Sequence, residues 1–453
     1  MAFSTLILAA GAGTRMKSEK PKVAHEILGK PMLRWVIDAA RAAGSEEVFT
    51  VLGHGRESTL TLAHDTTVII QEELLGTGHA LMIAMLELKA AGVATLVVLS
   101  GDTPLLQSST IQDMVDNHLE TGVDVSLLTM CLDDPSGYGR IVRDPEGNLC
   151  RIVEQKDASE QDLAIHEVNS GIYCFNTANL FSILTELNNQ NAQGEYYLTD
   201  VAALTLAHGG RVSAHLALDA SELRGINDRV QLAEATAEVQ RRINTQHMLD
   251  GVTMVDPSSV WIGPDVSLAP DVEILPLSTL MGTTAVGRNS VIGPLSRVTN
   301  SNIGEGCVVD DSVLYDSILE EGVRVGPRAY LRPGTIMRKG SRAGTHVEIK
   351  NSDIGEGSKV PHLSYIGDAQ LGKGVNIGAG SITCNYDGVN KHPTTIGDDS
   401  FVGSDTMFVA PVAMGKGAIT GAGSVITEDI PAGALAIARA RQTNKENWKK
   451  SHK

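Results

Sequence analysis

The sequence predicts an α/β domain, a long connecting helix and a parallel β-helix, in that order along the chain. Three observations predict this arrangement. Short apolar segments alternate with helical segments up to about residue 227, and residues 228–250 contain neither glycine nor proline. From Gly251 onward an aliphatic residue recurs every six positions, and 27 of the 46 glycines lie in this last part of the chain. A chain of 453 residues is long enough for two or more domains, each of which can bury its own core.

The composition disfavours several classes of protein. Lysine and arginine number 37 and aspartate and glutamate 54, so the net charge of −17 argues against a nucleic-acid partner and against an anionic membrane surface. The five cysteines form no C-x-x-C pair, which argues against a cysteine-rich zinc site or a disulfide framework. The apolar start lacks a basic segment, and no apolar run approaches the roughly 18 residues that span a bilayer. We therefore expect a cytoplasmic protein without membrane insertion.

The first part of the chain has the alternation of an α/β domain. Helix-period apolar residues occupy 31–43 and 79–90, between short apolar runs. The ligands of such domains lie at the carboxyl ends of the parallel strands, so the segments after the strands carry the functional information. The expected buried strands are Thr5–Ala9, Val48–Leu52, Thr67–Ile70 and Leu96–Leu99.

The first strand leads into a loop of small residues, Leu8-Ala9-Ala10-Gly11-Ala12-Gly13-Thr14-Arg15-Met16, and Pro21-Lys22 follows. Small residues let backbone N–H groups approach phosphate oxygens, and Arg15 and Lys22 supply positive charge for a polyphosphate. The loop is not a dinucleotide-binding G-x-G-x-x-G, because Met16 replaces the third glycine, and it is not a Walker A loop. A tight turn that requires small residues is the alternative. The added pair of cations favours a phosphate site.

A second candidate lies after the strand at 96–99, in Ser100-Gly101-Asp102-Thr103-Pro104-Leu105. A carboxylate just past a buried strand end is well placed to hold Mg²⁺, which prefers oxygen ligands and shares them with substrate phosphates. A helix cap or a turn is the alternative role for Asp102.

Residues 228–250 are predicted to form one helix, with Asp228 as its N-cap and Gly251 as its stop. A helix of this length is about 35 Å long at 1.5 Å per residue. We interpret it as a spacer between domains. The alternative is a core helix of the first domain.

The second part of the chain follows a six-residue period. An aliphatic residue every six positions, often followed by glycine, is the hexapeptide repeat of a parallel β-helix, in which each short strand points one side chain inward. The repetitive faces of such a prism commonly pack against copies of itself, so we expect a homotrimer. The inward positions are predicted in three series: Ile262, Leu268, Ile274, Leu280, Val286, Ile292 and Val298; then Val313, Leu319, Val325, Leu331, Met337 and Ala343; then Ile396, Val402, Phe408, Met414, Thr420 and Ile426.

The period is interrupted at residues 376–393, which are too long for one rung and should form a loop projecting from the prism. His362 stands shortly before this loop. A histidine with a pKa near neutrality is a suitable base for an attacking amine, although an isolated surface histidine is the simpler interpretation.

The first two candidate segments resemble the signature of sugar-1-phosphate nucleotidylyltransferases, which join a sugar phosphate to a nucleoside triphosphate and release pyrophosphate. Segments 71–80, 134–141, 152–154, 169–171, 195–200 and 225–227 are similar to one branch of them, the bifunctional N-acetylglucosamine-1-phosphate uridylyltransferases/glucosamine-1-phosphate N-acetyltransferases. The resemblance covers residues 3–448. It implies a Rossmann-like nucleotidyltransferase domain at 1–227, a linker helix at 228–250 and a left-handed β-helix N-acetyltransferase domain at 251–453.

The resemblance also implies the residues of the uridylyl-transfer site. Arg15 and Lys22 would assist the transfer, and Asp102 and Asn227 would hold Mg²⁺. The residues implied to bind UTP and UDP-N-acetylglucosamine are Leu8, Ala9, Ala10, Gly11, Lys22, Gln71, Gly76, Thr77, Ser100, Gly101, Asp102, Gly139, Glu154, Asn169 and Asn227.

For acetyl transfer the resemblance implies acetyl-CoA as donor and His362 as general base, with the Ala379 amide stabilising the thioester oxyanion. No acyl-enzyme is expected, so Cys384 is interpreted as structural. Glucosamine phosphate is implied to bind at Arg332, Lys350, Tyr365, Asn376 and Asn385, and acetyl-CoA at Ala379, Asn385, Tyr386, Ser404, Ala422, Arg439 and Lys445.

Two residues depart from the family pattern, since some relatives carry tyrosine at Ser100 and an aromatic or apolar residue at His346. Two alternatives also stay open. One is a single-activity nucleotidylyltransferase whose β-helix is structural or regulatory, and the other is a non-enzymatic trimeric scaffold. The bifunctional interpretation places the product, UDP-N-acetylglucosamine, in the synthesis of peptidoglycan and lipopolysaccharide-type precursors.

Overall fold

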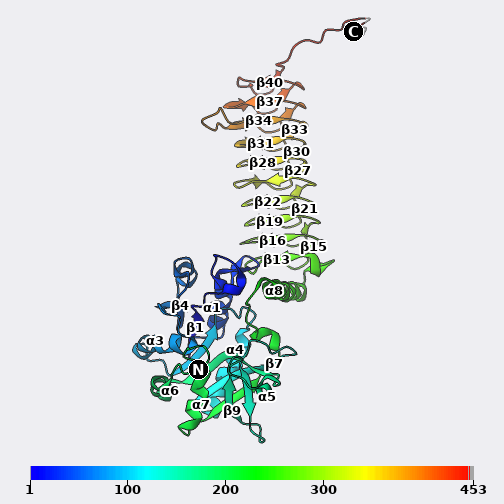
Figure 1. Cartoon of the computed structure of the whole chain (residues 1–453). Helices are drawn as coiled ribbons and strands as arrows, with labels where there is room; N and C mark the ends of the chain where they lie inside the picture. The colour runs from blue at the N-terminus through cyan, green and yellow to red at the C-terminus, as the bar shows by residue number, and fades with distance from the viewer. Residues whose placement is uncertain (1, 447, 449–453) are drawn as a thin grey trace. The chain divides into compact units, whose positions relative to one another are not determined.

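The computed structural model describes residues 2–446 and 448 (Figure 1). The chain divides into two compact units, Met1–Val239 and Gln240–Lys453. Among the described residues, none of the helices has the length and apolar character needed to cross a membrane.

The first unit is built on a mixed sheet whose main path runs in the order β11-β7-β10-β6-β1-β4-β5, with β8 and β9 joined at its side through β10. The strands β5, β4, β1 and β6 are parallel neighbours, and they coincide with the four segments predicted from the sequence. The strand bounds are β1 (Ser4–Ala9), β4 (Val48–Leu52), β5 (Thr67–Ile70), β6 (Thr95–Ser100), β7 (Val125–Cys131), β8 (Arg140–Arg143), β9 (Leu149–Val153), β10 (Glu167–Asn176) and β11 (Val212–Leu216); β2 (Glu26–Ile27) and β3 (Lys30–Pro31) form a separate hairpin.

Helices cover both faces of this sheet, which explains why its central strands are apolar without alternation. On one face α1 and α4 pack with Ile7 and Leu99, and on the other α3, α6 and α7 pack with Leu6 and Val98. The helix bounds are α1 (Met32–Ala42), α2 (Arg56–Thr59), α3 (Thr77–Ala90), α4 (Ser108–Thr121), α5 (Glu160–Leu163), α6 (Thr177–Ile183) and α7 (Asp200–Ala207), with 3-10 turns η1 (Thr14–Met16) and η2 (Lys22–Ala24) after β1.

The helix α8 (Arg229–Leu249) begins and ends as the sequence predicts. The Asp228 carboxylate accepts hydrogen bonds from the backbone N–H groups of Val230 and Gln231, both at 2.9 Å. At the other end Gly251 has a φ of 98°, and the residue after it donates to the His247 carbonyl at 3.0 Å, which is a Schellman termination.

The division of the chain into two units falls within α8, between Val239 and Gln240. In the second unit the buried Gln240 and Asn244 side chains donate to the Val260 carbonyl at 2.6 and 2.9 Å. The last turns of α8 therefore belong to the base of the β-helix.

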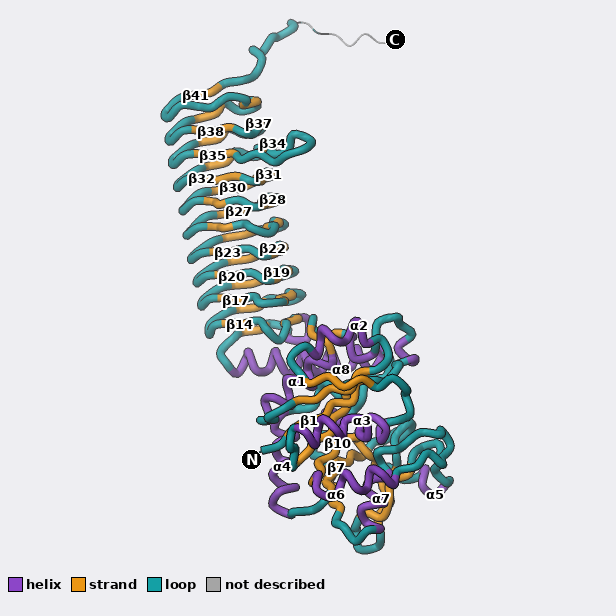
Figure 2. Tube along the Cα trace, turned by 90° about the vertical axis from the view of Figure 1, so that its left-hand side faces the viewer, coloured by secondary structure: helices purple, strands orange, loops and turns teal. Residues whose placement is uncertain are grey.

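The rest of the second unit is a parallel β-helix whose coils stack on one another (Figure 2). Within the described residues its strands form three parallel sheets, of 11 strands from β12 (Thr253–Met254) to β41 (Leu435–Ala436), 10 from β13 (Trp261–Ile262) to β40 (Val425–Ile426), and 9 from β14 (Ser267–Leu268) to β38 (Val412–Met414). One continuous apolar core runs through the stack. Glycine follows many inward residues because the next coil is close: a Cβ on Gly378 would overlap the Ser404 backbone nitrogen.

The inward positions of the first and third predicted series are confirmed, apart from a partly exposed Leu268, but the start of the second series is wrong. In β22 (Val313–Tyr315) the buried side chain is Leu314, while Val313 is partly exposed. Leu314 pairs with Val298, so this coil has sixteen residues where the regular repeat has eighteen. The steps from Val298 to Ile303, from Val309 to Leu314 and from Leu314 to Leu319 are five residues each, so the six-residue period is regained only from Leu319 onward.

A projecting loop is present, as predicted, but it is shorter than residues 376–393, because β33 (Asn376–Ile377) and β34 (Ile382–Cys384) are strands of the regular coils. The loop joins β34 to β35 (Thr394–Ile396) and is visible beside β34 in Figure 2. An antiparallel bridge between Tyr386 and Lys391 closes it. The predicted fold class, an α/β domain followed by a helix and a β-helix of hexapeptide repeats, is confirmed.

Candidate active sites

The first candidate site is a cavity of about 400 Å³ at the carboxyl ends of β1 and β6. Parallel pairing sets Leu8 opposite Ser100 at this edge, and the Gly101 N–H donates to the Leu8 carbonyl at 2.9 Å. A Cβ on Gly11 would meet no atom within 4 Å, which leaves room for a ligand against the loop backbone. Ten of the residues predicted to bind UTP line the cavity together: Leu8, Ala9, Ala10, Gly11, Lys22, Gln71, Gly76, Thr77, Ser100 and Asp102.

The predicted charged residues meet at one end of this cavity. The Lys22 ammonium forms a salt bridge with Asp102 and donates to Asn227 Oδ1 at 3.1 Å. The Arg15 guanidinium donates to the same Asn227 oxygen at 2.8 Å. The turns η1 and η2 and the start of α8 therefore help to bring together residues from three distant segments of the chain.

The electrostatics at this point favour an ionised carboxylate. Burial alone would raise the pKa of Asp102, but the charge and hydrogen bond of Lys22 outweigh it and hold the pKa below its usual value. Two cations facing one carboxylate leave net positive charge for phosphate oxygens.

The same residues fit a magnesium ion. Asp102 and Asn227 present two side-chain oxygens, and a cation, the Lys22 ammonium, already contacts both of them. In residues 2–446 and 448 there is no cluster of three or more His, Cys, Asp or Glu side chains that could form an all-protein metal site. A site with only two protein oxygens suits Mg²⁺, which retains waters and takes further ligands from substrate phosphates.

The segment predicted to contact the nucleotide base lies along the same cavity. Gln71 follows β5, and its side-chain amide donates to the Gly76 carbonyl at 3.2 Å and contacts the His79 ring at 3.0 Å. Gly76, the residue just before α3, has a φ of 103°, and a Cβ there would overlap the Tyr196 carbonyl oxygen. Gln71 is therefore held at the entrance of α3, facing the cavity with Thr77.

The predicted sugar contacts form a second group that does not line this cavity. The Asn169 N–H donates to the Gly139 carbonyl at 2.9 Å, and a Cβ on Gly139 would lie 3.4 Å from Glu154 Oε1. Glu154 lines a neighbouring hollow of about 470 Å³ and accepts from the Thr199 hydroxyl at 3.2 Å. Burial raises the pKa of Glu154, and nearby carboxylates add to the shift.

In the second unit four residues of the predicted acetyl-transfer site lie on successive coils at one corner of the β-helix. His362 ends β30 (Lys359–His362), and the next coils place Ala379, Ser404 and Ala422 just after β33 (Asn376–Ile377), β36 (Phe401–Val402) and β39 (Ile419–Thr420). Backbone hydrogen bonds link these coils, for example from the Asp405 N–H to the Ala379 carbonyl at 2.7 Å. The His362 side chain is exposed.

Most of the residues predicted to bind the sugar and its phosphate lie at another corner, at the ends of strands of the 10-stranded sheet. There β25 (Tyr330–Leu331), β28 (Glu348–Lys350) and β31 (Tyr365–Gly367) are adjacent, so Arg332 and Lys350 follow one another on neighbouring coils. The Tyr365 hydroxyl lies 3.5 Å from the Asn385 amide. Asn376 lies on the 11-stranded sheet instead, and the remaining predicted residues, Tyr386, Arg439 and Lys445, are exposed.

Two further residues at this corner were not predicted from the sequence. Lys391, in the projecting loop, lies beside Lys350, whose ammonium lowers the pKa of Lys391. The Asp368 carboxylate accepts from Asn351 at 2.7 Å and Asn385, and it contacts Lys350 at 3.4 Å. A lysine in the loop that interrupts the repeat could have indicated a binding residue, but its contact with Lys350 depends on how the loop folds back.

The α/β unit has a strand-end cavity with facing cations, and the β-helix has a histidine at one corner and a cation cluster at another, so each unit carries a candidate site of its own. Residues 5–135 match the MobA-like NTP transferase domain family. The chain is 50% identical over 445 residues to the bifunctional protein GlmU of Caldanaerobacter subterraneus subsp. tengcongensis, which covers 98% of this chain and 97% of that protein. It is 51% identical over 446 residues to the bifunctional protein GlmU of Carboxydothermus hydrogenoformans, covering 98% and 99%. A crystal structure of UDP-glucose pyrophosphorylase complexed with UDP-glucose aligns at 20% identity and a TM-score of 0.43, over 53% of this chain and all of that one.

The chain belongs to the family of bifunctional GlmU proteins. It is a bifunctional transferase, so the resemblance recognised from the sequence is confirmed. The two alternatives, a single-activity enzyme and a non-enzymatic scaffold, are not retained.

Proposed function

We infer that the chain catalyses two steps in the synthesis of UDP-N-acetylglucosamine. In the first, acetyl-CoA acetylates glucosamine 1-phosphate; in the second, UTP and N-acetylglucosamine 1-phosphate give the product and pyrophosphate. The observation that carries this proposal is the pairing of two distinct sites on one chain, the Lys22–Asp102–Asn227 cluster and the His362 corner. The product would feed cell-wall precursor synthesis.

For uridylyl transfer, an oxygen of the sugar phosphate attacks the α-phosphorus of UTP in line, and the bond to pyrophosphate breaks. The loop backbone at Ala10 and Gly11 approaches the phosphates, while Arg15 and Lys22 neutralise charge on the leaving pyrophosphate. Gln71 and Thr77 orient the base, and Gly139, Glu154 and Asn169 hold the sugar.

We propose Mg²⁺ as the cofactor of this step. Asp102 and Asn227 would hold it, and when bound it would neutralise phosphate charge. Lys22 contacts both of these oxygens in the structure, which supports the assignment because the two groups already share one cation.

For acetyl transfer, the sugar amine attacks the thioester carbonyl, so a C–N bond forms and the C–S bond breaks. His362 accepts the proton of the amine, the Ala379 N–H stabilises the oxyanion, and the departing thiolate of CoA takes up a proton. Arg332 and Lys350, with Lys391, bind the phosphate, and Tyr365, Asn376 and Asn385 bind the sugar. The coenzyme lies along Ser404 and Ala422, with Tyr386, Arg439 and Lys445 nearby.

The domain limits predicted from the sequence stay part of this proposal: uridylyltransferase at 1–227, linker helix at 228–250 and acetyltransferase at 251–453. We also propose a cytoplasmic homotrimer. His362 and the Arg332–Lys350 pair lie at different corners of one prism, which supports an acetyltransferase site completed by a neighbouring chain. Static light scattering at micromolar concentration should give three times the chain mass, and a monomer would contradict the proposal.

Two single substitutions test the assignment of the sites. The two steps are assayed separately, acetyl transfer with glucosamine 1-phosphate and acetyl-CoA, and uridylyl transfer with N-acetylglucosamine 1-phosphate and UTP. His362→Ala should reduce CoA release at least about a hundredfold and leave pyrophosphate release within twofold of the parent, since it removes only the base of one step. Asp102→Ala should reduce pyrophosphate release by a similar factor and leave CoA release within twofold of the parent. Loss of both activities in either variant would contradict two independent sites.

A further inference from the structure

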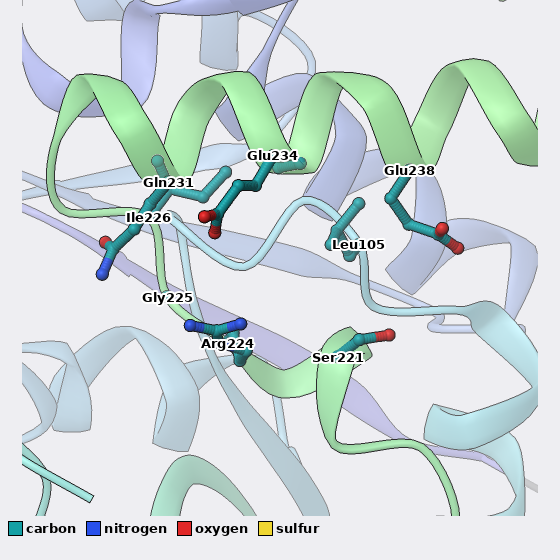
Figure 3. Close-up of a pocket in the computed structure, with 9 residues that line it drawn as sticks. Leu105, Ser221, Arg224, Gly225, Ile226, Gln231, Glu234 and Glu238 are labelled. Atoms are coloured by element: carbon teal, nitrogen blue, oxygen red, sulfur yellow. The ribbon is translucent and has the colours of Figure 1, made fainter. Parts of the chain in front are cut away.

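A pocket in the first unit lies between the first turns of α8 and the segment that carries Asn227. Its volume is about 150 Å³, and Gln231, Gly225 and Ile226 line it from opposite sides (Figure 3). At its edge the side-chain oxygen of Gln231 accepts a hydrogen bond from the backbone N–H of Asn227 at 2.7 Å. This contact joins α8 directly to the candidate metal ligand.

The other polar groups of Asn227 are already oriented. Its side-chain nitrogen donates to the Gly225 carbonyl at 3.2 Å, which turns Oδ1 toward Arg15 and Lys22. The preceding residue is fixed as well, because the Ile226 N–H donates to the Asp102 carbonyl at 2.9 Å. The backbone N–H of Asn227 is therefore a further group through which the protein fixes the position of this residue. It donates its hydrogen bond to Gln231.

Helix capping alone does not account for this contact. Gln231 is the third residue of α8, and in a capping box the third residue bonds the N–H of the N-cap. Here the N-cap is Asp228, whose carboxylate already accepts from two N–H groups of the first turn. Gln231 instead reaches one residue further back, to Asn227.

We propose that Gln231 is a positioning residue for uridylyl transfer. Its side-chain oxygen holds Asn227 so that Oδ1 faces the point shared with Asp102 and Lys22. The proposal rests on the proposed function, since it takes Asn227 as a metal ligand.

The test compares variants that keep or remove the acceptor. Gln231→Leu and Gln231→Asn lose it, the second by shortening the chain, whereas Gln231→Glu retains a side-chain oxygen at the same reach. Gln246→Leu is the matched control, because Gln246 lies on the same helix and its side chain donates to the Asp250 carboxylate at 3.0 Å. Mn²⁺ serves as the probe, and its binding to the full-length protein with UDP-N-acetylglucosamine is measured by electron paramagnetic resonance.

We expect Gln231→Leu and Gln231→Asn to weaken Mn²⁺ binding about tenfold, and to raise by a similar factor the Mg²⁺ concentration needed for half-maximal pyrophosphate release. Gln231→Glu should stay within threefold of the parent and Gln246→Leu within twofold. CoA release serves as an internal control and should be unchanged in all four variants. Equal losses in Gln231→Leu and Gln231→Glu, or unchanged Mn²⁺ binding in Gln231→Leu, would overturn the proposal.

Asn227→Ala separates this proposal from the function on which it rests. If Asn227→Ala weakens Mn²⁺ binding and Gln231→Leu does not, the metal assignment stands and the positioning role is wrong. If Asn227→Ala leaves Mn²⁺ binding unchanged, the metal assignment itself fails.

Discussion

Asp102 and Glu154 are both partly buried carboxyls that line cavities of the first unit, yet their pKa values shift in opposite directions. Lys22 outweighs the effect of burial at Asp102. Glu154 has a hydroxyl partner, Thr199, and several carboxylates nearby, so burial dominates and raises its pKa. The partner of each carboxyl, rather than burial alone, decides its protonation.

The raised pKa of Glu154 predicts how stability and sugar binding change with pH. The folded state binds this proton more tightly than the unfolded chain does, so the stabilisation it gives is full at low pH and is lost as the pH rises through the raised pKa. At neutral pH Glu154→Gln removes a buried charge, and we expect Tm to rise by about 2 °C. The KM for N-acetylglucosamine 1-phosphate should rise roughly tenfold, because a charged acceptor for the sugar is lost.

Calorimetry and uridylyl-transfer kinetics across a pH series check this prediction. The parent KM should increase on acidification at a pH above the ordinary range of glutamate, and the variant should lack that dependence. Glu160→Gln, at an exposed site on α5, is the control and should change neither quantity. A fall in Tm for Glu154→Gln at neutral pH would contradict the interpretation.

Residues inside contiguous motifs could be predicted from the sequence, and residues defined by tertiary contacts could not. Arg15, Lys22 and Asp102 stand in recognisable loops after strands, and the structure brings them together with Asn227. The contact of Lys391 with Lys350 is different, because it depends on the projecting loop folding back against a distant segment. Gln231 and Asn227 are only four residues apart, but no sequence pattern shows that the Gln231 side chain reaches past the N-cap to the Asn227 N–H.

The β-helix could also be predicted only in part, its architecture but not the register of every coil. Its architecture follows from the six-residue period, because one inward aliphatic side chain per strand is enough to define a continuous core. The period alone did not reveal the shortened coil, in which Leu314 rather than Val313 points inward. Turn length sets this register, and turns carry a weaker sequence signal than the aliphatic repeat.

A pair of neighbouring substitutions tests this register. Leu314→Ala should destabilise the second unit by about 2–5 kcal/mol, because it opens a cavity in a closed core. Val313→Ala removes a partly exposed side chain and should cost less than about 1 kcal/mol. Tm and the heat inactivation of acetyl transfer measure the difference, and a larger effect at Val313 would restore the register predicted from the sequence.

For the molecule as a whole, the net charge of −17 is compatible with anionic substrates because cations gather locally. Arg15 and Lys22 serve the first unit, and Arg332, Lys350 and Lys391 the second. The excess of glycine beyond Gly251 follows from the close stacking of coils in the β-helix. Two compact units with separate sites agree with membership of a bifunctional family.

The central claim, two consecutive transfers by one chain, is tested most directly by following free CoA and pyrophosphate separately in one reaction. Purified protein receives glucosamine 1-phosphate, acetyl-CoA, UTP and Mg²⁺. We expect CoA to appear first and pyrophosphate to follow it, and omission of acetyl-CoA should suppress both. Pyrophosphate release without CoA release in the complete mixture would contradict the claim.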